Sequence, residues 1–394
     1  MTSRDPEAYY AASLPMPKTI VLLALLAGCS SPAAGPARET PDGAGEEPGD
    51  VAAPADTRKP ASDVATTITP DASASAPDVP VPADAGADAA RSVPDAPPTT
   101  SLGPAGGACP GGPYGSPLPA DRTAAMIRGF PGRTLEAPVW VAAQKALYFS
   151  DIGGTLTNGR IQKYTPADGK IAVFVDNVGI GGLAVDAQGM LVAASHDKQR
   201  LTRFDPATGQ RTDVEGGAMY LGKPFNQVND VVVRSDGNMY FSDPTYQLAG
   251  RPGQGVMAFY RLSPLGEVTR LATATNPNGV ALSPDGSSLY LATTGGGPLQ
   301  KLALAADGSP MGAGATFISS NSDGMAVDCA GNLYLTAGGL KVYSATGQSL
   351  GNIGGLSSGF TTNSAFGGDD RQTLFITNST ALYQIKLNVP GFPD

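Results

Sequence analysis

The sequence predicts an all-β fold, a six-bladed β-propeller with four-stranded blades, preceded by a signal peptide and a disordered linker. A short apolar, β-prone strand recurs six times, at spacings of 44, 48, 50, 44 and 41 residues. Gly-containing turns flank most copies of this strand, and no extended helical periodicity interrupts them. Short strands linked by hairpins at such a period are typical of propeller blades.

Residues 1–28 are predicted to form a lipoprotein signal peptide. Lys18 precedes the apolar run 20–26, which is too short to span a bilayer as a helix and fits a signal-peptide core. Asp5 and Glu7 are unusual ahead of such a signal, so a start at Met16 is the alternative.

The apolar run ends in Leu-Ala-Gly-Cys, which resembles the bacterial lipobox. The resemblance implies that Cys29 is lipidated, that the protein is an exported bacterial lipoprotein, and that a membrane holds it through this anchor. Ser30 after the cysteine favours the outer membrane, on its periplasmic or surface face. An ordinary secretory signal followed by a chance cysteine is the alternative.

Residues 29–107 are predicted to be a disordered tether. No aromatic residue occurs from Ser30 to Pro113, and the stretch is rich in Ala, Pro, Asp, Gly and Thr. This composition cannot bury enough apolar surface to offset the entropy of ordering the chain. Most of the formal charge of −9 lies in the tether, so the rest of the chain is close to neutral. A near-neutral domain argues against nucleic acid as a partner.

Residues 108–394 are predicted to form one propeller rather than two domains, because six repeats fill this stretch. The recurring strands begin at Leu147, Leu191, Met239, Leu289, Leu333 and Leu374. One blade cannot bury both of its faces, so the ring has to close on itself. A closed ring needs no partner subunit, and a monomer is therefore expected.

The two remaining cysteines, Cys109 and Cys329, are predicted to form a disulfide. Export would place them in an oxidising compartment, where an even pair in a secreted domain indicates a bridge. The bond would tie the start of the domain to a late blade and close a loop of about 220 residues. Loop-entropy estimates give such a bond about 4–5 kcal/mol. Two buried free thiols are the alternative.

One equivalent position in the repeats, eleven or twelve residues before the second residue of the recurring strand, is polar in five of six copies. In a propeller this position is the entry to the innermost strand, where side chains point into the central channel. The residues there are Glu136, Gly181, Asn229, Asn278, Asp323 and Asn363. Carboxylate and amide oxygens are hard ligands of the kind that Ca²⁺ accepts. The sequence therefore predicts a divalent metal in the channel, Ca²⁺ first, with Zn²⁺ or Mn²⁺ as alternatives.

Five segments at blade spacing resemble motifs of the gluconolactonase family, which includes regucalcin and the luciferin-regenerating enzymes. The Leu-Glu-Ala-Pro-Val-Trp segment resembles the opening Glu-Gly-Pro-x-Trp motif of the family. The five segments are residues 135–140, 226–232, 276–281, 323–328 and 363–368. They occur in the family's order, and the match spans about residues 130–390.

The resemblance implies a metal-dependent hydrolase that opens a small cyclic ester, a sugar lactone by family default. Carried over by position, the family's metal ligands fall on Glu136, Asn229, Asn278 and Asp323. The metal would polarise the lactone carbonyl, and Asp323 would activate water as general base or, in a variant mechanism, act as nucleophile. A carboxylate on a cation has a lowered pKa, so the metal would have to acidify the water as well.

Four residues are expected to contact the substrate: Asn226, Asp230, His196 and Asn363. His196 is the only histidine, and a structural role for it is the alternative. A single histidine also excludes a paraoxonase-like histidine pair. Trp140 is expected to pack between blades.

The sequence departs from the family pattern in three places. These differences leave the metal ligands in place and affect which substrate is expected. Gly181 replaces a polar residue, Ala137 replaces a glycine beside the first ligand, and Gln227 with Val228 replaces a small residue and a proline.

Two other functions stay open on the sequence alone. A phosphotriesterase-like hydrolase would use the same metal shell. A non-catalytic cell-surface propeller would bind a sugar or a protein and hold Ca²⁺ for structure only.

Overall fold

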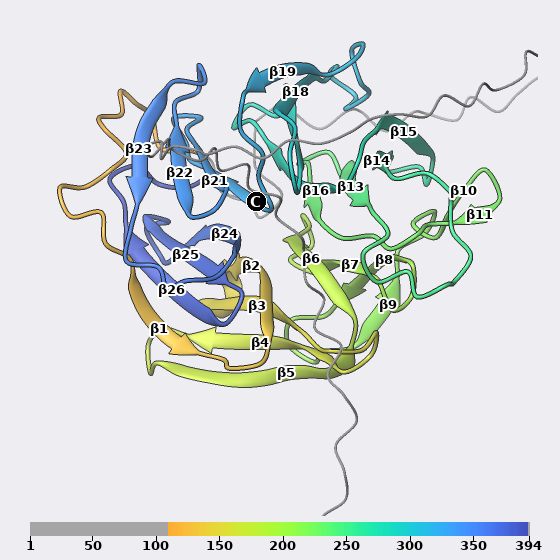
Figure 1. The fold of residues 1–394 in the computed structure, drawn as a ribbon, viewed down its shortest axis with the longest axis horizontal. Helices are drawn as coiled ribbons and strands as arrows, with labels where there is room; N and C mark the ends of the chain where they lie inside the picture. The colour runs from red at the N-terminus through yellow and green to blue at the C-terminus, as the bar shows by residue number, and fades with distance from the viewer. Residues whose placement is uncertain (1–108, 393–394) are drawn as a thin grey trace, which may run out of the picture. The chain divides into compact units, whose positions relative to one another are not determined.

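The computed structural model describes residues 109–392, which form a ring of six four-stranded antiparallel sheets (Figure 1). The all-β six-bladed propeller predicted from the repeats is confirmed. Cys29 and the segments 1–28 and 29–107 lie outside the described residues. Within the described part, no helix is long and apolar enough to cross a membrane.

The first three blades follow one another along the chain, each numbered from its innermost strand outward. Blade 1 contains β2 (Thr134–Val141), β3 (Ala146–Ile152), β4 (Gly159–Thr165) and β5 (Lys170–Val178), with a 3₁₀ turn at Ala142–Gln144. Blade 2 contains β6 (Ile180–Val185), β7 (Leu191–Ser195), β8 (Arg200–Phe204) and β9 (Arg211–Asp213). Blade 3 contains β12 (Val231–Val233), β13 (Met239–Asp243), β14 (Ala258–Leu262) and β15 (Val268–Thr273). A small hairpin of β10 (Met219–Tyr220) and β11 (Lys223–Pro224) precedes blade 3.

The last three blades complete the ring. Blade 4 contains β16 (Pro277–Leu282), β17 (Ser288–Thr293), β18 (Leu299–Ala303) and β19 (Ala315–Ile318). Blade 5 contains β20 (Met325–Val327), β21 (Leu333–Thr336), β22 (Leu340–Tyr343) and β23 (Ser349–Ile353). Blade 6 contains β24 (Thr361–Gly367), β25 (Thr373–Asn378), β26 (Ala381–Lys386) and β1 (Ala125–Gly129).

The ring closes through a strand from the opposite end of the domain. β1 pairs antiparallel with β26, with Ala125 opposite Gln384 and Gly129 opposite Ala381. Sequence analysis predicted closure but did not identify this strand, because β1 lacks the recurring motif. The backbone hydrogen bonds of β1 join the beginning of the domain to its last blade and satisfy an edge that would otherwise stay unpaired.

Six hydrophobic clusters make up the core, one between each pair of neighbouring blades. The second residue of each recurring strand supplies a buried side chain to them. These residues are Tyr148, Val192, Tyr240, Tyr290, Tyr334 and Phe375. Trp140 of blade 1 stacks on Phe375 of blade 6, with ring centroids 6.0 Å apart. The predicted packing role of Trp140 between blades is therefore confirmed.

Hydrogen bonds near the axis join neighbouring blades at every junction. In order around the ring they are Ser150 Oγ to Gly181 O (2.8 Å), Gly182 N to Asn229 O, Val280 N to Asp230 Oδ2 (3.0 Å), Gly279 N to Asp323 O (2.8 Å), Gly324 N to Thr362 O (2.7 Å) and Thr362 Oγ1 to Leu135 O (2.7 Å). These bonds set the distance between the strands that carry the candidate site.

The close approach of these strands explains why blade 2 has a glycine where the other blades have polar residues. A Cβ atom added to Gly181 would come within 2.4 Å of the Asn229 carbonyl oxygen, which is backbone and cannot move aside. A side chain at this position would therefore force the second and third blades apart.

Replacing Gly181 with alanine is expected to lower the free energy of unfolding by about 1–3 kcal/mol, the usual cost of overpacking. Urea denaturation of the purified protein measures the change. Gly154→Ala is the matched control, because no atom lies within 4 Å of a Cβ placed there. Equal stability of the two variants would show that the strand spacing at blade 2 is not a constraint.

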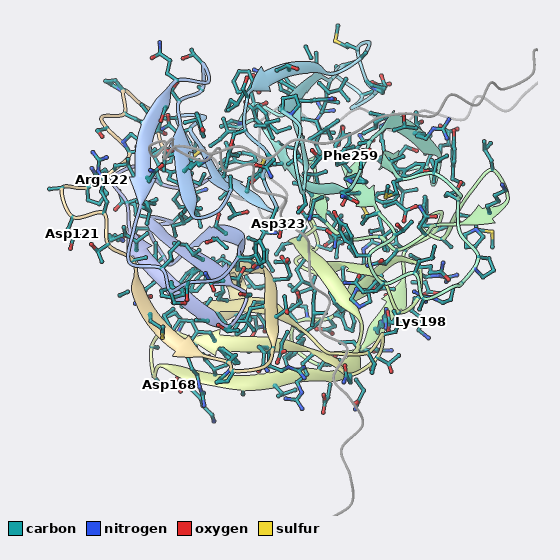
Figure 2. The ribbon with its side chains drawn as sticks, in the orientation of Figure 1. Asp121, Arg122, Asp168, Lys198, Phe259 and Asp323 are labelled. Atoms are coloured by element: carbon teal, nitrogen blue, oxygen red, sulfur yellow. A yellow bond between two sulfur atoms is a disulfide. The ribbon has the colours of Figure 1, made fainter. Side chains whose placement is uncertain are left out.

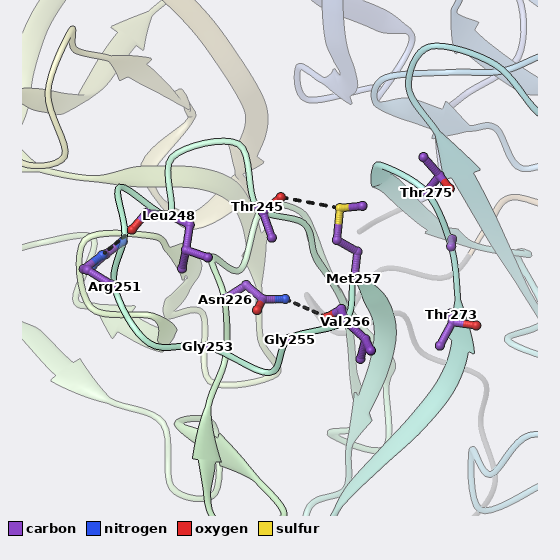
Figure 3. Close-up of a pocket in the computed structure, with 11 residues that line it drawn as sticks. Asn226, Thr245, Leu248, Arg251, Gly253, Gly255, Val256, Met257, Thr273 and Thr275 are labelled. Atoms are coloured by element: carbon purple, nitrogen blue, oxygen red, sulfur yellow. Dashed lines mark hydrogen bonds between the residues drawn. The ribbon is translucent and has the colours of Figure 1, made fainter.

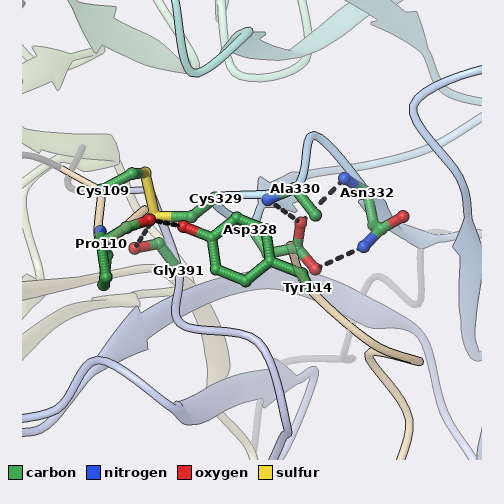
Figure 4. The surroundings of a disulfide bond; sticks show 8 residues. All are labelled: Cys109, Pro110, Tyr114, Asp328, Cys329, Ala330, Asn332 and Gly391. Atoms are coloured by element: carbon green, nitrogen blue, oxygen red, sulfur yellow. Dashed lines mark hydrogen bonds between the residues drawn. A yellow bond between two sulfur atoms is a disulfide. The ribbon is translucent and has the colours of Figure 1, made fainter. Parts of the chain in front are cut away.

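The predicted disulfide between Cys109 and Cys329 is confirmed (Figure 4). The two Cα atoms lie 5.5 Å apart, although 220 residues separate them in the sequence. Cys329 lies in the turn between β20 and β21, which Asp328 stabilises by accepting the N–H groups of Ala330 and Asn332, each at 2.9 Å. The bond thus ties the first described residue to the fifth blade.

Candidate active site

Acidic side chains from three blades meet near the axis of the ring. Glu136 belongs to β2, Asp230 comes directly before β12, and Asp323 lies two residues before β20. Asp323 is near the centre of the ring in Figure 2. Asn278 of β16 also reaches this group, because its amide interacts with Asp323. The innermost strands therefore place these four side chains together, as their equivalent sequence positions predicted for three of them.

The carboxyl groups strongly disfavour one another's charge. The pKa of Glu136 is raised well above its ordinary value by burial first, then by repulsion from Asp323 and Asp230. Burial, and then Asp230, raises the pKa of Asp323 to about 7, although the Asn278 amide opposes the shift. Burial also raises the pKa of Asp230 to about 7, despite the Val280 N–H that it accepts at 3.0 Å.

This donor set fits a hard divalent cation. The charged groups that act on Glu136 and Asp323 are other carboxylates, so no cationic side chain within residues 109–392 offsets their charge. A bound cation would offset it and would be held by oxygen atoms, as Ca²⁺ prefers. Within residues 109–392, no group of three or more His, Cys, Asp or Glu side chains is arranged to hold a metal. Coordination here would therefore depend on the amide oxygens of Asn229 and Asn278.

The two remaining polar residues of the aligned set are Asn229 and Asn363. The Asn229 N–H donates to Ser242 O at 3.0 Å, and its carbonyl accepts the N–H of Gly182. The Asn363 side chain packs against Gly324, next to Asp323, and its Oδ1 accepts the N–H of Ser364 at 2.8 Å. Asn229 thus lies two residues before the inner strand β12, and Asn363 lies on the inner strand β24.

Asn226 anchors a loop. Its amide donates to the carbonyls of Asp243 at 3.2 Å and Val256 at 2.8 Å, and its Oδ1 accepts the N–H of Gln254 at 2.8 Å. These bonds hold the 244–257 loop, which joins β13 to β14. A substrate contact by Asn226 stays a prediction, because the side chain is fully buried in this structure.

His196 lies apart from the carboxylates, in the loop after β7. Its side chain is 1% exposed, and burial lowers its pKa to about 4. Its charged neighbours are Asp197, Arg251 and Arg211. The imidazole is therefore neutral at neutral pH. Its Nδ1 is buried and has no hydrogen-bond partner among the described residues, and a substrate contact by His196 stays a prediction.

Tyr246 is a residue at this site to which sequence analysis assigned no role. It lies on the 244–257 loop, and its side chain interacts with those of Thr294 and Asn278 and lies near Asp323 and Glu136. Asn278 in turn donates to Thr294 Oγ1 at 2.6 Å. The Asp-Pro-Thr-Tyr segment that follows the third recurring strand was the available signal.

Gln227, one of the departures from the family pattern, holds the same loop. Its side-chain oxygen accepts the N–H of Gln247, the residue after Tyr246. Its own N–H donates to Asp243 Oδ1 at 2.7 Å. Gln227 therefore helps to hold the part of the loop that carries Tyr246. Val228, its neighbour, is buried in the core between blades 2 and 3.

The ring of six sheets and the hard-oxygen donors on its axis define a propeller with an acidic channel site. The chain belongs to the SMP-30/Gluconolactonase/LRE-like family, whose model matches residues 135–380. This range includes every residue of the candidate site. The family predicted from the five sequence segments is thereby confirmed.

Curated and solved relatives are similar over most of their own lengths. The gluconolactonase of Zymomonas mobilis is 28% identical over 289 residues, 65% of this chain and 79% of that protein. The pentonolactonase of Haloferax volcanii is 29% identical over 254 residues, 62% of this chain and 81% of that protein. The structure of a gluconolactonase from Xanthomonas campestris is 31% identical, with a TM-score of 0.59, and the match covers 71% of this chain and 99% of that one.

The raised pKa values predict that Asp323→Asn stabilises the cation-free protein, by an amount that grows with pH. Below about pH 4, Asp323 is protonated in both folded and unfolded chains. Between its ordinary pKa of 3.8 and the folded value of about 7, only the unfolded chain releases the proton, which favours unfolding of the native sequence. Asparagine removes this penalty.

Urea denaturation in EDTA at pH 4, 5.5 and 7 measures the stability difference between Asp323→Asn and the native sequence. Added Ca²⁺ should make the native sequence the more stable of the two proteins at pH 7. Only the native sequence keeps both the Glu136 and the Asp323 carboxylates that are proposed to bind the cation. If the stability difference between the two proteins does not change with pH, the pKa of Asp323 is not raised in the folded chain.

Proposed function

We propose that this protein is a lactonase that adds water to the carbonyl of a small cyclic ester and releases the open hydroxy acid. The observation that carries the proposal is the meeting of Glu136, Asp323 and Asn278 on the axis of a propeller of this family. The gluconolactonase and pentonolactonase relatives support sugar lactones as the first substrates to test.

We propose that Glu136, Asn229, Asn278 and Asp323 hold a divalent cation, with Ca²⁺ first and Zn²⁺ or Mn²⁺ as alternatives. When bound, the cation would polarise the ester carbonyl and stabilise the negative charge that develops on its oxygen. The support is the chemistry of the donors: two carboxylates that repel one another, with neutral amides beside them.

Asp323 is the proposed general base. Its carboxylate takes a proton from the attacking water as the water oxygen bonds to the carbonyl carbon. The bond between that carbon and the ring oxygen then breaks, and the ring oxygen takes up a proton to become the product hydroxyl. A pKa near 7 without cation makes Asp323 more basic than an ordinary aspartate. A bound cation lowers that pKa and acidifies the water in turn.

Lactone turnover by the purified full-length chain tests this function. Glucono-1,5-lactone and a pentonolactone are assayed above their spontaneous hydrolysis, with and without EDTA. We expect turnover that EDTA abolishes and Ca²⁺ restores. Turnover of a phosphotriester but no lactone would replace the proposal with the phosphotriesterase alternative. A bound cation without any turnover would favour the non-catalytic binding propeller.

We also propose that Cys29 anchors the protein in a bacterial outer membrane. The lipobox-like sequence before it is the support. Labelling of the full chain with radioactive palmitate in a bacterial host should occur in the native sequence and be absent in Cys29→Ser. Equal labelling of the two proteins would show that Cys29 is not the lipidated residue.

A further inference from the structure

A cavity of about 960 Å³ opens on blade 3 beside the candidate active site (Figure 3). The 244–257 loop forms one wall, and residues 273–275, where β15 leads towards β16, form the other. Both walls continue into the site: Thr245 is followed by Tyr246, and Thr275 lies three residues before Asn278. The volume is at the upper end of the range for small-molecule sites, about 300–1,000 Å³. The cavity can therefore accept a group attached to a substrate that reacts on the axis.

Three polar side chains in the walls of this cavity, those of Arg251, Asn226 and Thr245, are already bonded within the protein. The Arg251 guanidinium donates to the carbonyls of Leu248 at 3.3 Å, His196 at 2.7 Å and Asp197 at 3.0 Å. The Asn226 amide is engaged by the loop, as described above. Thr245 Oγ1 lies 3.6 Å from the Met257 sulfur and donates to it (Figure 3). Among the side chains that line the cavity, the hydroxyls of Thr273 and Thr275 remain as partners for a polyhydroxylated ligand.

Apolar atoms supply the larger part of the exposed wall. Leu248, Val256, Met257 and Ala274 line the cavity. Val256 is 40% exposed, and Tyr246, next to Thr245 in the wall, is 39% exposed. Large apolar side chains left in water beside a cavity favour an apolar ligand, because covering them removes their surface from water.

We propose that this cavity is a subsite for an alkyl substituent, so that the preferred substrates are lactones bearing a hydrocarbon side chain of several carbons. The ring carbonyl would lie at the carboxylates on the axis, and the side chain would pass Tyr246 into the cavity. This inference rests on the proposed lactonase function and narrows its substrate class beyond the sugar lactones of the relatives.

Two lactones that share a ring and differ in the side chain test the subsite. δ-Valerolactone has the bare ring, and δ-decalactone carries a pentyl chain beside the ring oxygen. With the full-length native chain and Ca²⁺, kcat/KM for δ-decalactone should exceed that for δ-valerolactone at least tenfold.

A cavity-filling variant makes the comparison specific. Val256→Trp should lower kcat/KM for δ-decalactone at least tenfold and change that for δ-valerolactone less than twofold. Val173→Trp is the matched control, because Val173 is 47% exposed on the outer strand of blade 1. That variant should leave both values unchanged.

Binding of two lactams, which resist hydrolysis, separates the subsite from the chemistry. Calorimetry with 6-pentylpiperidin-2-one and piperidin-2-one should give a dissociation constant at least tenfold lower for the pentyl compound, and Val256→Trp should remove that difference. Turnover of δ-valerolactone without any preference for the pentyl chain would overturn the subsite and leave the lactonase intact. Preference of the protein for the pentyl lactam, with no turnover of either lactone or of glucono-1,5-lactone, would sustain the subsite and overturn the lactonase. Equal binding of the two lactams would overturn the subsite.

Discussion

Replacing Asp323 with asparagine is expected to lower kcat for lactone hydrolysis about a thousandfold or more while the protein stays folded. Asparagine keeps the shape of the side chain but cannot take a proton from water, and positioned proton transfer contributes about 10²–10⁴-fold to rate. The change also removes one of two carboxylates proposed to hold the cation. Steady-state kinetics with glucono-1,5-lactone measures the loss.

The stability of this variant distinguishes lost chemistry from lost structure. Because burial raises the pKa of Asp323 to about 7, the uncharged amide should leave the cation-free protein at least as stable as the native sequence at pH 7. Asp369→Asn is a control for the loss of a carboxylate elsewhere, since Asp369 is exposed and pairs with the exposed Lys145, at 3.0 Å. An Asp323→Asn variant with near-native kcat would remove Asp323 from the proposed mechanism.

Removing the disulfide is expected to have the largest effect on stability. The bond between Cys109 and Cys329 closes a loop of 220 residues, and the loop-entropy model gives such a loop about 5 kcal/mol. The double variant Cys109→Ser, Cys329→Ser should lose about this much free energy of unfolding, measured by urea denaturation. Its kcat at low denaturant should stay close to native, because Cys329 lies in the turn that follows β20, whereas Asp323 precedes that strand.

Reduction supplies an independent version of the same experiment. Dithiothreitol should lower the stability of the native sequence to that of the double variant and should leave the double variant unchanged. Cys29 is kept in both proteins, so its thiol is common to the two. A reduced native protein as stable as the oxidised one would show that the closure by β1 and β26 holds the ring without the bond.

The repeat pattern in the sequence was sufficient to predict the blades and most of the ring of polar residues. A strand and its turn depend on neighbours along the chain, so alternation, β-branched residues and glycine turns are visible without the fold. The equivalent positions that contain Glu136, Asn278 and Asp323 are visible for the same reason, since each opens an inner strand. The cysteine pairing followed from having two cysteines in one expected compartment.

Tertiary structure decided how other side chains reach that ring, including Asp230, which sequence analysis expected to contact the substrate. Asp230 adds a third carboxylate because it lies one residue beyond the aligned position and its Oδ2 accepts the Val280 N–H from the next blade. Tyr246 arrives from a loop that Asn226 and Gln227 hold in place. His196 lies in the loop after β7, where its carbonyl accepts a hydrogen bond from Arg251 at 2.7 Å.

The sequence by itself therefore determined the strands, their number and the positions that open onto the axis. The closing strand β1, the glycine contacts between blades and the cavity of blade 3 were decided by the folded chain. The physical reason is that periodicity records how a residue relates to its neighbours in sequence. Contacts across blades depend on ring closure and loop conformation, which join residues that no local pattern relates.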